Sequence, residues 1–140
     1  MSSLKRQALY FLCIGGFGFL VDAGVLTWLV TVQNWGLYSG RAVSFFLAVT
    51  ATWYLNRRIT FIHHTSPARG CEYVLYLSTQ TVGAVINLGV YAGVIARAPE
   101  LGSYPVIPLG FGAAAALVFN FSTAKKFVFK RRPSDQAGNS

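Results

Sequence analysis

The chain has 140 residues, of which 54% are hydrophobic and only 11% are charged, and its formal net charge is +8. A soluble domain usually has about a quarter of its residues charged, so this composition excludes an ordinary soluble enzyme and indicates a membrane protein. The basic residues lie at the ends of apolar stretches. Membrane topology and lipid headgroups explain such a distribution better than nucleic acid does.

Apolar stretches separated by short polar loops predict four transmembrane helices. The chain is long enough for these spans and short loops, but it leaves no room for a soluble catalytic domain. The predicted fold class is an all-α membrane protein, a single domain over residues 1–140 with a polar tail at 131–140. The spans are expected at about residues 8–32, 41–56, 73–96 and 106–124.

Lysine and arginine are divided unequally between the two sides of the predicted helices. Ten of the twelve fall on one side, and only Arg41 and Arg97 fall on the other. The positive-inside rule then places both termini and the middle loop in the cytoplasm. We therefore expect a multi-pass protein of the cytoplasmic (inner) membrane. The ten residues on the cytoplasmic side are Lys5, Arg6, Arg57, Arg58, Arg69, Lys125, Lys126, Lys130, Arg131 and Arg132.

The first predicted span contains one acidic residue, Asp22, somewhat past its middle. A carboxylate at the centre of a membrane helix costs about 2.5–3.5 kcal/mol, whereas each Leu, Ile, Phe or Val returns only about 0.3–0.6 kcal/mol. Gly15, Gly18 and Asp22 are spaced i, i+3, i+7 and so share one face of the helix. We interpret this small, polar face as the one that packs on protein, and Asp22 as a functional candidate.

The second half of the chain repeats the first. Displacing the first span by 65 residues and the second by 68 aligns small and polar positions in both helices, and also the basic pairs that follow. Each unit holds two spans, so both halves run the same way through the membrane. We predict a tandem parallel repeat of two helical hairpins, with halves at about residues 5–62 and 70–130. The aligned positions include Gly18 with Gly83, Asp22 with Asn87, Ser44 with Gly112, Thr52 with Asn120, and Arg57-Arg58 with Lys125-Lys126.

One motif and several short segments carry a family resemblance. The motif is Asn-Arg-Arg-x-Thr-Phe at residues 56–61, which closes the second span. The segments are Gly15-Gly16, Leu20-Val21-Asp22, Arg41-Ala42-Val43-Ser44-Phe45, Tyr54-Leu55, Gly83, Ile86-Asn87-Leu88, Asn120-Phe121 and Lys125-Lys126-Phe127-Val128-Phe129. Together, over about residues 5–130, they resemble the GtrA-like family of small four-span membrane proteins. Members often have Asn before both basic pairs and another one turn earlier. Here Thr52 and Ala124 occupy two of those four places.

The resemblance implies a role in cell-surface polysaccharide synthesis. Such a protein would move a polyprenyl-phosphate-linked sugar from the cytoplasmic to the outer leaflet of the membrane, where a glycosyltransferase uses it. Some relatives are the membrane anchor of a polyprenyl-phosphate sugar synthase, so the alternative is a non-transporting anchor or partner of such a glycosyltransferase. A small multidrug-type exporter is less favoured, because glycines share the face of Asp22 and the cytoplasmic end is strongly cationic.

Moving a phosphate headgroup through hydrocarbon requires cationic ends and a polar path. The basic pairs would capture the phosphate, although they also act as topology signals and headgroup anchors. The amides would bind sugar hydroxyls or hold helices together. Arg41 would receive the phosphate at the far end, and Asp22 would pair with Arg41, bind sugar hydroxyls or take up a coupling proton. The expected substrate-binding residues are Asp22, Arg41, Asn56, Arg57, Arg58, Gln80, Asn87, Asn120, Lys125 and Lys126.

The sequence contains no acid–base pair, nucleophile constellation or metal-ligand spacing, so we expect no enzyme, no catalytic residue and no cofactor. His63 and His64 are adjacent in a loop with no further ligand nearby, which argues against a metal site. The expected partners are the polyprenyl-phosphate-linked sugar, membrane lipids and a glycosyltransferase, and not nucleic acid. Four short helices hardly enclose a long path, which favours a homodimer or larger assembly.

Overall fold

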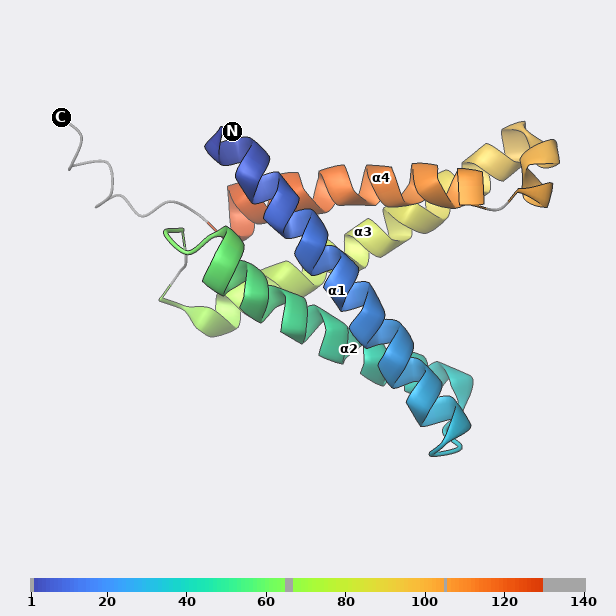
Figure 1. Ribbon diagram of the computed structural model, residues 1–140, viewed down its shortest axis with the longest axis horizontal. Helices are drawn as coiled ribbons and strands as arrows, with labels where there is room; N and C mark the ends of the chain where they lie inside the picture. The colour runs from blue at the N-terminus through green and yellow to red at the C-terminus, as the bar shows by residue number, and fades with distance from the viewer. Residues whose placement is uncertain (1, 65–66, 105, 130–140) are drawn as a thin grey trace. The chain divides into compact units, whose positions relative to one another are not determined.

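The structure is a computed structural model that describes residues 2–64, 67–104 and 106–129. The chain divides into two compact units, the first reaching Pro67 and the second beginning at Ala68. Each unit contains a pair of antiparallel helices that pack on one another (Figure 1). The described residues form helices and turns and no β-strand. The predicted polar tail at 131–140 lies outside the described residues.

The first hairpin consists of α1 (Ser3–Thr31), α2 (Leu37–Leu55) and η1 (Asn56–Thr60), a five-residue π-helix that continues α2. The Ser2 side chain caps α1 by accepting a hydrogen bond from the backbone N–H of Lys5 at 3.3 Å. The turn to α2 contains Asn34 with a φ of 57°, a left-handed conformation that asparagine tolerates better than most residues.

The second hairpin consists of α3 (Arg69–Arg97), α4 (Val106–Thr123) and η3 (Ala124–Val128), a π-helix that continues α4. A short 3-10 helix, η2 (Pro99–Ser103), connects α3 to α4. Pro99 ends α3 because the residue before a proline is disfavoured in the helical region, and Ala98 has a φ of −137° and a ψ of 72°.

Three of the long helices in the described part of the chain begin before the apolar stretches that predicted them. α1 begins at residue 3 instead of 8, α2 at 37 instead of 41, and α3 at 69 instead of 73. Hydropathy detects only the part of a helix that suits hydrocarbon, whereas the backbone hydrogen bonds continue through the polar residues on either side. At 29 residues, α1 is about 44 Å long, which exceeds a hydrocarbon layer of about 30 Å.

Within the described residues, three helical segments are long and apolar enough to cross a membrane: Ser3–Thr31, Arg69–Arg97 and Ile107–Val128. The second predicted span, now α2, is not among them. Its length is sufficient at 19 residues, but Arg41 and several hydroxyl side chains lower its mean hydropathy.

Small residues allow the two helices of the first hairpin to approach closely. Gly18 of α1 lies directly against Thr52 of α2, and a Cβ at Gly18 would overlap the Thr52 methyl group. Gly15, which the periodicity places on the same face, is exposed and has open space around it. The prediction that this face packs on protein is therefore confirmed for Gly18, whereas Gly15 does not take part in the contact with α2.

Aromatic side chains close the end of each hairpin at which the π-helix lies. In the first hairpin the Phe11 and Phe61 rings meet edge to face, with centroids 6.3 Å apart and an interplanar angle of 66°. In the second, the Tyr76 and Phe129 rings do the same at 6.1 Å and 61°. All four side chains are buried. Edge-to-face pairs of this kind contribute about 0.5–1.5 kcal/mol beyond their buried area.

The close approach in the second hairpin gives a direct test of its packing. A Cβ at Gly112 would lie 2.6 Å from the backbone oxygen of Asn87, whereas a Cβ at Gly110 would meet nothing within 4 Å. Because a backbone atom cannot move aside as a side chain does, we expect Gly112→Ala to destabilise the protein by about 1–3 kcal/mol. The matched control Gly110→Ala should leave stability unchanged or raise it. Thermal unfolding in detergent would measure both, and equal melting temperatures would contradict the close contact.

Candidate functional site

A cluster of charged and hydroxyl side chains joins the two helices of the first hairpin. Asp22 of α1 forms an ion pair with Arg41 of α2, in which Arg41 Nη1 donates to Asp22 Oδ2. The Ser44 hydroxyl donates to the other carboxylate oxygen, Oδ1, at 2.7 Å. Both oxygens of Asp22 therefore have a partner on α2. Of the three roles expected for Asp22, pairing with Arg41 is the one that the structure contains.

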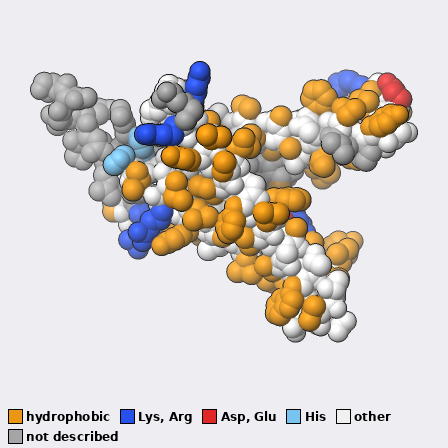
Figure 2. All heavy atoms as spheres, viewed as in Figure 1, with side chains coloured by type: hydrophobic (Ala, Val, Ile, Leu, Met, Phe, Trp, Pro, Cys, Tyr) orange, Lys and Arg blue, Asp and Glu red, His pale blue; other side chains and the backbone are white. Residues whose placement is uncertain are grey.

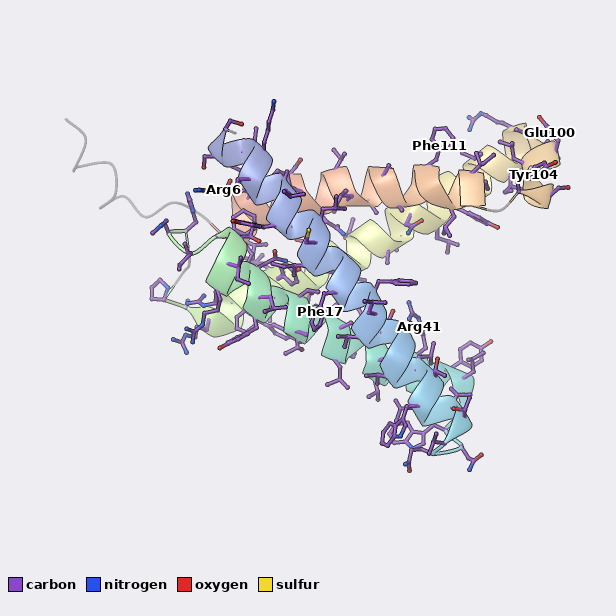
Figure 3. All side chains as sticks on the ribbon, in the orientation of Figure 1. Arg6, Phe17, Arg41, Glu100, Tyr104 and Phe111 are labelled. Atoms are coloured by element: carbon purple, nitrogen blue, oxygen red, sulfur yellow. The ribbon has the colours of Figure 1, made fainter. Side chains whose placement is uncertain are left out.

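The members of this cluster differ in their exposure. The Asp22 side chain is 16% exposed, the Arg41 side chain is 53% exposed, and Ser44 is fully buried. Figure 3 shows Arg41 beside α1, which it reaches from α2. The carboxylate is thus enclosed between the helices, while half of the guanidinium surface stays open.

The depth of the cluster follows from helix geometry. Asp22 lies nine residues before the end of α1 at Thr31, or about 13 Å along the helix axis. If α1 is centred in a hydrocarbon layer of about 30 Å, its 44 Å length extends roughly 7 Å beyond the layer at each end. The carboxylate then lies inside the layer by a similar distance. A charge at such a depth requires a partner, which Arg41 and Ser44 provide.

The expected basic pair of the first hairpin lies in η1, against aromatic rings. The Arg57 guanidinium is 6.0 Å from the centroid of the Trp53 ring, and that of Arg58 is 5.2 Å from the Tyr54 ring. Each contact joins residues one helical turn apart. A cation–π contact contributes about 0.5–1 kcal/mol at an exposed site. The rings therefore hold both guanidinium groups along the helix, at the end of the hairpin where α1 begins.

The corresponding pair of the second hairpin lies in η3. Lys125 and Lys126 are both exposed, and the Lys126 ammonium is 5.3 Å from the Phe127 ring. Each basic pair is thus carried by a five-residue π-helix, closed by a backbone bond from Phe61 to Asn56 at 2.9 Å or from Phe129 to Ala124 at 2.8 Å. The π-helix is rare and occurs mostly as single turns, frequently at functional sites.

Asn56 is enclosed, although it was expected to offer its amide to a sugar. Its exposed fraction is 0%, and Thr60 Oγ1 donates to its side-chain oxygen at 2.8 Å across the π-turn. Both residues are buried in η1. This geometry gives Asn56 an internal structural contact.

Amide side chains make the polar contacts between the helices of the second hairpin. Asn120 Nδ2 of α4 donates to Gln80 Oε1 of α3 at 3.1 Å, and the Asn120 side chain lies against Gly83. Asn120 Oδ1 is buried and has no hydrogen-bond partner among the described residues. Asn87 of α3 lies against the backbone at Gly112 of α4. Amide side chains therefore follow the line where α3 meets α4.

The structure brings together two sets of the expected site residues. Asp22 meets Arg41 within the first hairpin, and Gln80 meets Asn120 within the second. The sequence analysis placed Ser44 among the aligned small and polar positions of the repeat but did not include it in the site. The signal was its spacing, because Ser44 follows Arg41 by three residues and so shares its face of α2.

These features define a helical, multi-pass membrane protein with polar contacts between its paired helices. The chain belongs to a known family, because the family model described as GtrA/DPMS, transmembrane domain, matches residues 10–129. No curated protein and no solved structure gives a match. Membership of this family ties the protein to lipid-linked sugar metabolism.

The ion pair can be tested by a double-mutant cycle with Asp22→Asn, Arg41→Gln and the double variant. Each single change leaves the other partner uncompensated, so the double variant should be more stable than the sum of the two effects predicts. Arg41 is half exposed, whereas Asp22 is largely enclosed. We therefore expect a coupling energy of about 1–2 kcal/mol, a value between those of exposed and of buried ion pairs. Denaturant unfolding in detergent would measure the coupling, and additive effects would show that no pair forms in solution.

Proposed function

We propose that the protein translocates a polyprenyl-phosphate-linked sugar across the cytoplasmic membrane, for the synthesis or modification of cell-surface polysaccharide. The observation that carries the proposal is the cluster of Asp22, Arg41 and Ser44 within an apolar hairpin of a chain from this family. An intramembrane acid is costly, and such residues mark transport pathways more often than simple anchors. The proposal includes no catalytic step.

The proposed architecture is a tandem parallel repeat of two hairpins, with α2 as a fourth span and both termini in the cytoplasm. Contacts at corresponding positions support this repeat. The ring pair Phe11–Phe61 corresponds to Tyr76–Phe129. In the same way, the contact of Gly18 with Thr52 corresponds to that of Gly83 with Asn120, and Asp22–Ser44 to Asn87–Gly112. These contacts obey the displacements of 65 and 68 residues that relate the two halves in sequence.

The ion pair provides a mechanism for handling a phosphate at the outer end of the path. The guanidinium of Arg41 is half exposed, so it can bind a phosphate through two parallel hydrogen bonds. Asp22 keeps its hydrogen bond from Ser44 when Arg41 leaves, which lowers the cost of the exchange. The released carboxylate oxygen can then accept hydrogen bonds from sugar hydroxyls.

The basic pairs and the amides bind the substrate in the remaining steps of the proposed translocation. Arg57, Arg58, Lys125 and Lys126 capture the phosphate at the cytoplasmic surface. Gln80, Asn87 and Asn120 offer neutral donors and acceptors to the sugar, whereas Asn56 supports the π-helix from inside. A glycosyltransferase uses the product in the outer leaflet, and a homodimer provides a longer enclosed path than one chain does.

A second candidate is a membrane anchor or partner of a polyprenyl-phosphate glycosyltransferase. The observation that favours it is the internal use of the amides, since Asn56 bonds Thr60 and Asn120 bonds Gln80. Interhelical hydrogen bonds of this kind contribute about 0.6 kcal/mol each and require no transport role. An assay in proteoliposomes distinguishes the two candidates. A transporter moves the lipid without any other protein, whereas an anchor does not.

A transport assay on Asp22→Asn tests the role of the cluster. We expect the variant to insert normally but to move a polyprenyl-phosphate sugar about tenfold more slowly in proteoliposomes, equivalent to about 1.4 kcal/mol on the barrier. The matched control is Glu100→Gln, which removes an exposed acid from η2 and should transport at the wild-type rate. Circular dichroism would verify equal helix content. Equal rates for the wild type and Asp22→Asn would reduce Asp22 to a structural role.

Binding measurements on the double variant Arg57→Gln, Arg58→Gln test capture by η1. Removing both guanidinium groups should weaken binding of a polyprenyl-phosphate sugar roughly tenfold. Trp53 beneath Arg57 is a built-in reporter when Trp28 and Trp35 are replaced by phenylalanine. The control is Arg97→Gln at the end of α3, which should bind as the wild type does. Unchanged affinity in the double variant would leave the pair as a topology signal alone.

A further inference from the structure

A pocket of about 370 Å³ lies in the first hairpin, where the start of α1 meets η1 and the turn that follows it. This volume falls in the range of about 300–1,000 Å³ that is typical of small-molecule sites. Its polar lining comes from two segments that are distant in sequence and that pack together. The lining includes Ser3, Arg6, Gln7, Tyr10, His63 and His64.

The electrostatic character of the pocket favours an anion. Arg6 contributes a permanent positive charge, and the start of α1 adds the positive end of the helix dipole. Among the described residues, those lining the pocket include no Asp or Glu. Figure 3 shows Arg6 on the first turns of α1, and Figure 2 shows lysine, arginine and histidine side chains near this end of the hairpin.

One residue on the wall of the pocket carries a hydrogen-bond acceptor without a donor in the described part of the chain. Gln7 Oε1 is buried and has no hydrogen-bond partner among the described residues. A buried acceptor without a donor costs about 1–3 kcal/mol, so an occupant that donates to this oxygen, once the Gln7 side chain turns it toward the pocket, gains affinity. Phosphate oxygens at neutral pH are mainly acceptors, whereas hydroxyl groups donate. The pocket therefore suits a phosphate with a hydroxyl-bearing group attached.

We propose that this pocket binds the headgroup of a membrane lipid in which a phosphodiester carries a hydroxylated group. Arg6 binds the phosphate, Gln7 accepts a hydrogen bond from a hydroxyl of the attached group, and Ser3 and Tyr10 offer further hydroxyls. This chemistry is shared by a polyprenyl-phosphate sugar and by phosphatidylglycerol. The site is separate from the basic pairs proposed above for capture, and its test requires no transport.

Two adjacent cations provide a matched pair of variants. Arg6 lines the pocket, whereas Lys5, the preceding residue, is not among the residues that line it. Arg6→Gln and Lys5→Gln remove the same charge from the same exposed stretch of α1. A general effect of net charge or topology would therefore change both variants equally, and a pocket would change only the first.

The experiment measures binding to the full chain in nanodiscs of phosphatidylcholine. The probes are a polyprenyl-phosphate glucose, phosphatidylglycerol, soluble glucose 1-phosphate and inorganic phosphate. We expect at least one of the two lipids to bind more tightly than inorganic phosphate. Arg6→Gln should weaken that binding roughly tenfold, and Lys5→Gln should change it by less than about twofold. The lipid with the higher affinity identifies the source of the headgroup.

A second variant tests the hydroxyl contact. Gln7→Leu removes the buried acceptor at nearly constant volume, so it should weaken the binding of glucose 1-phosphate more than that of inorganic phosphate, which carries fewer hydroxyl groups. Three results would overturn the proposal: the absence of saturable binding by either lipid, equal effects of Arg6→Gln and Lys5→Gln, or equal affinity for the lipids and inorganic phosphate. If the wild-type chain binds the headgroup in this pocket but moves no lipid in proteoliposomes, only the proposed function is contradicted.

Discussion

Close contact between paired helices depends on a glycine that lies against a polar side chain of the neighbouring helix. Gly18 receives Thr52 in the first hairpin, and Gly83 receives Asn120 in the second. Helices in lipid gain little from burying apolar surface, because the lipid tails are equally apolar, so small residues and interhelical hydrogen bonds supply much of their association. One turn beyond Gly18, the same contact brings Asp22 within reach of α2. The polar cluster therefore depends on the packing of these small residues.

Much of the site was predictable from spacing along single helices, and the rest depended on packing between them. Asp22 and Arg41 stand out as charges in apolar stretches, and their pairing was one of the expected alternatives. The enclosure of Asn56 was not predictable, because a polar residue beside a basic pair has the same pattern whether it faces a ligand or Thr60. The pocket at Arg6 was missed because its two walls lie about fifty residues apart in the sequence.

The two hairpins have the same helix contacts but different chemistry at the corresponding positions. Asp22 corresponds to Asn87, and Arg41 corresponds to Leu109, which is an ordinary exposed apolar residue. An amide and an aliphatic side chain thus occupy the positions that hold an ion pair in the first hairpin. The second hairpin therefore shows that two helices of this fold pack together without a charged residue at the positions of Asp22 and Arg41.

This difference bears on why the first hairpin retains its ion pair. Replacing a buried ion pair by apolar residues is often neutral or stabilising by about 1–4 kcal/mol, so such a pair is weak support for a fold. The second hairpin makes the corresponding helix contact with Asn87 against Gly112. Hairpin stability alone therefore does not account for Asp22 and Arg41. A guanidinium that is half open, beside a carboxylate that Ser44 still holds, suits the exchange of one anion for another. An anchor does not require a charge at that depth, so the ion pair favours the transport proposal.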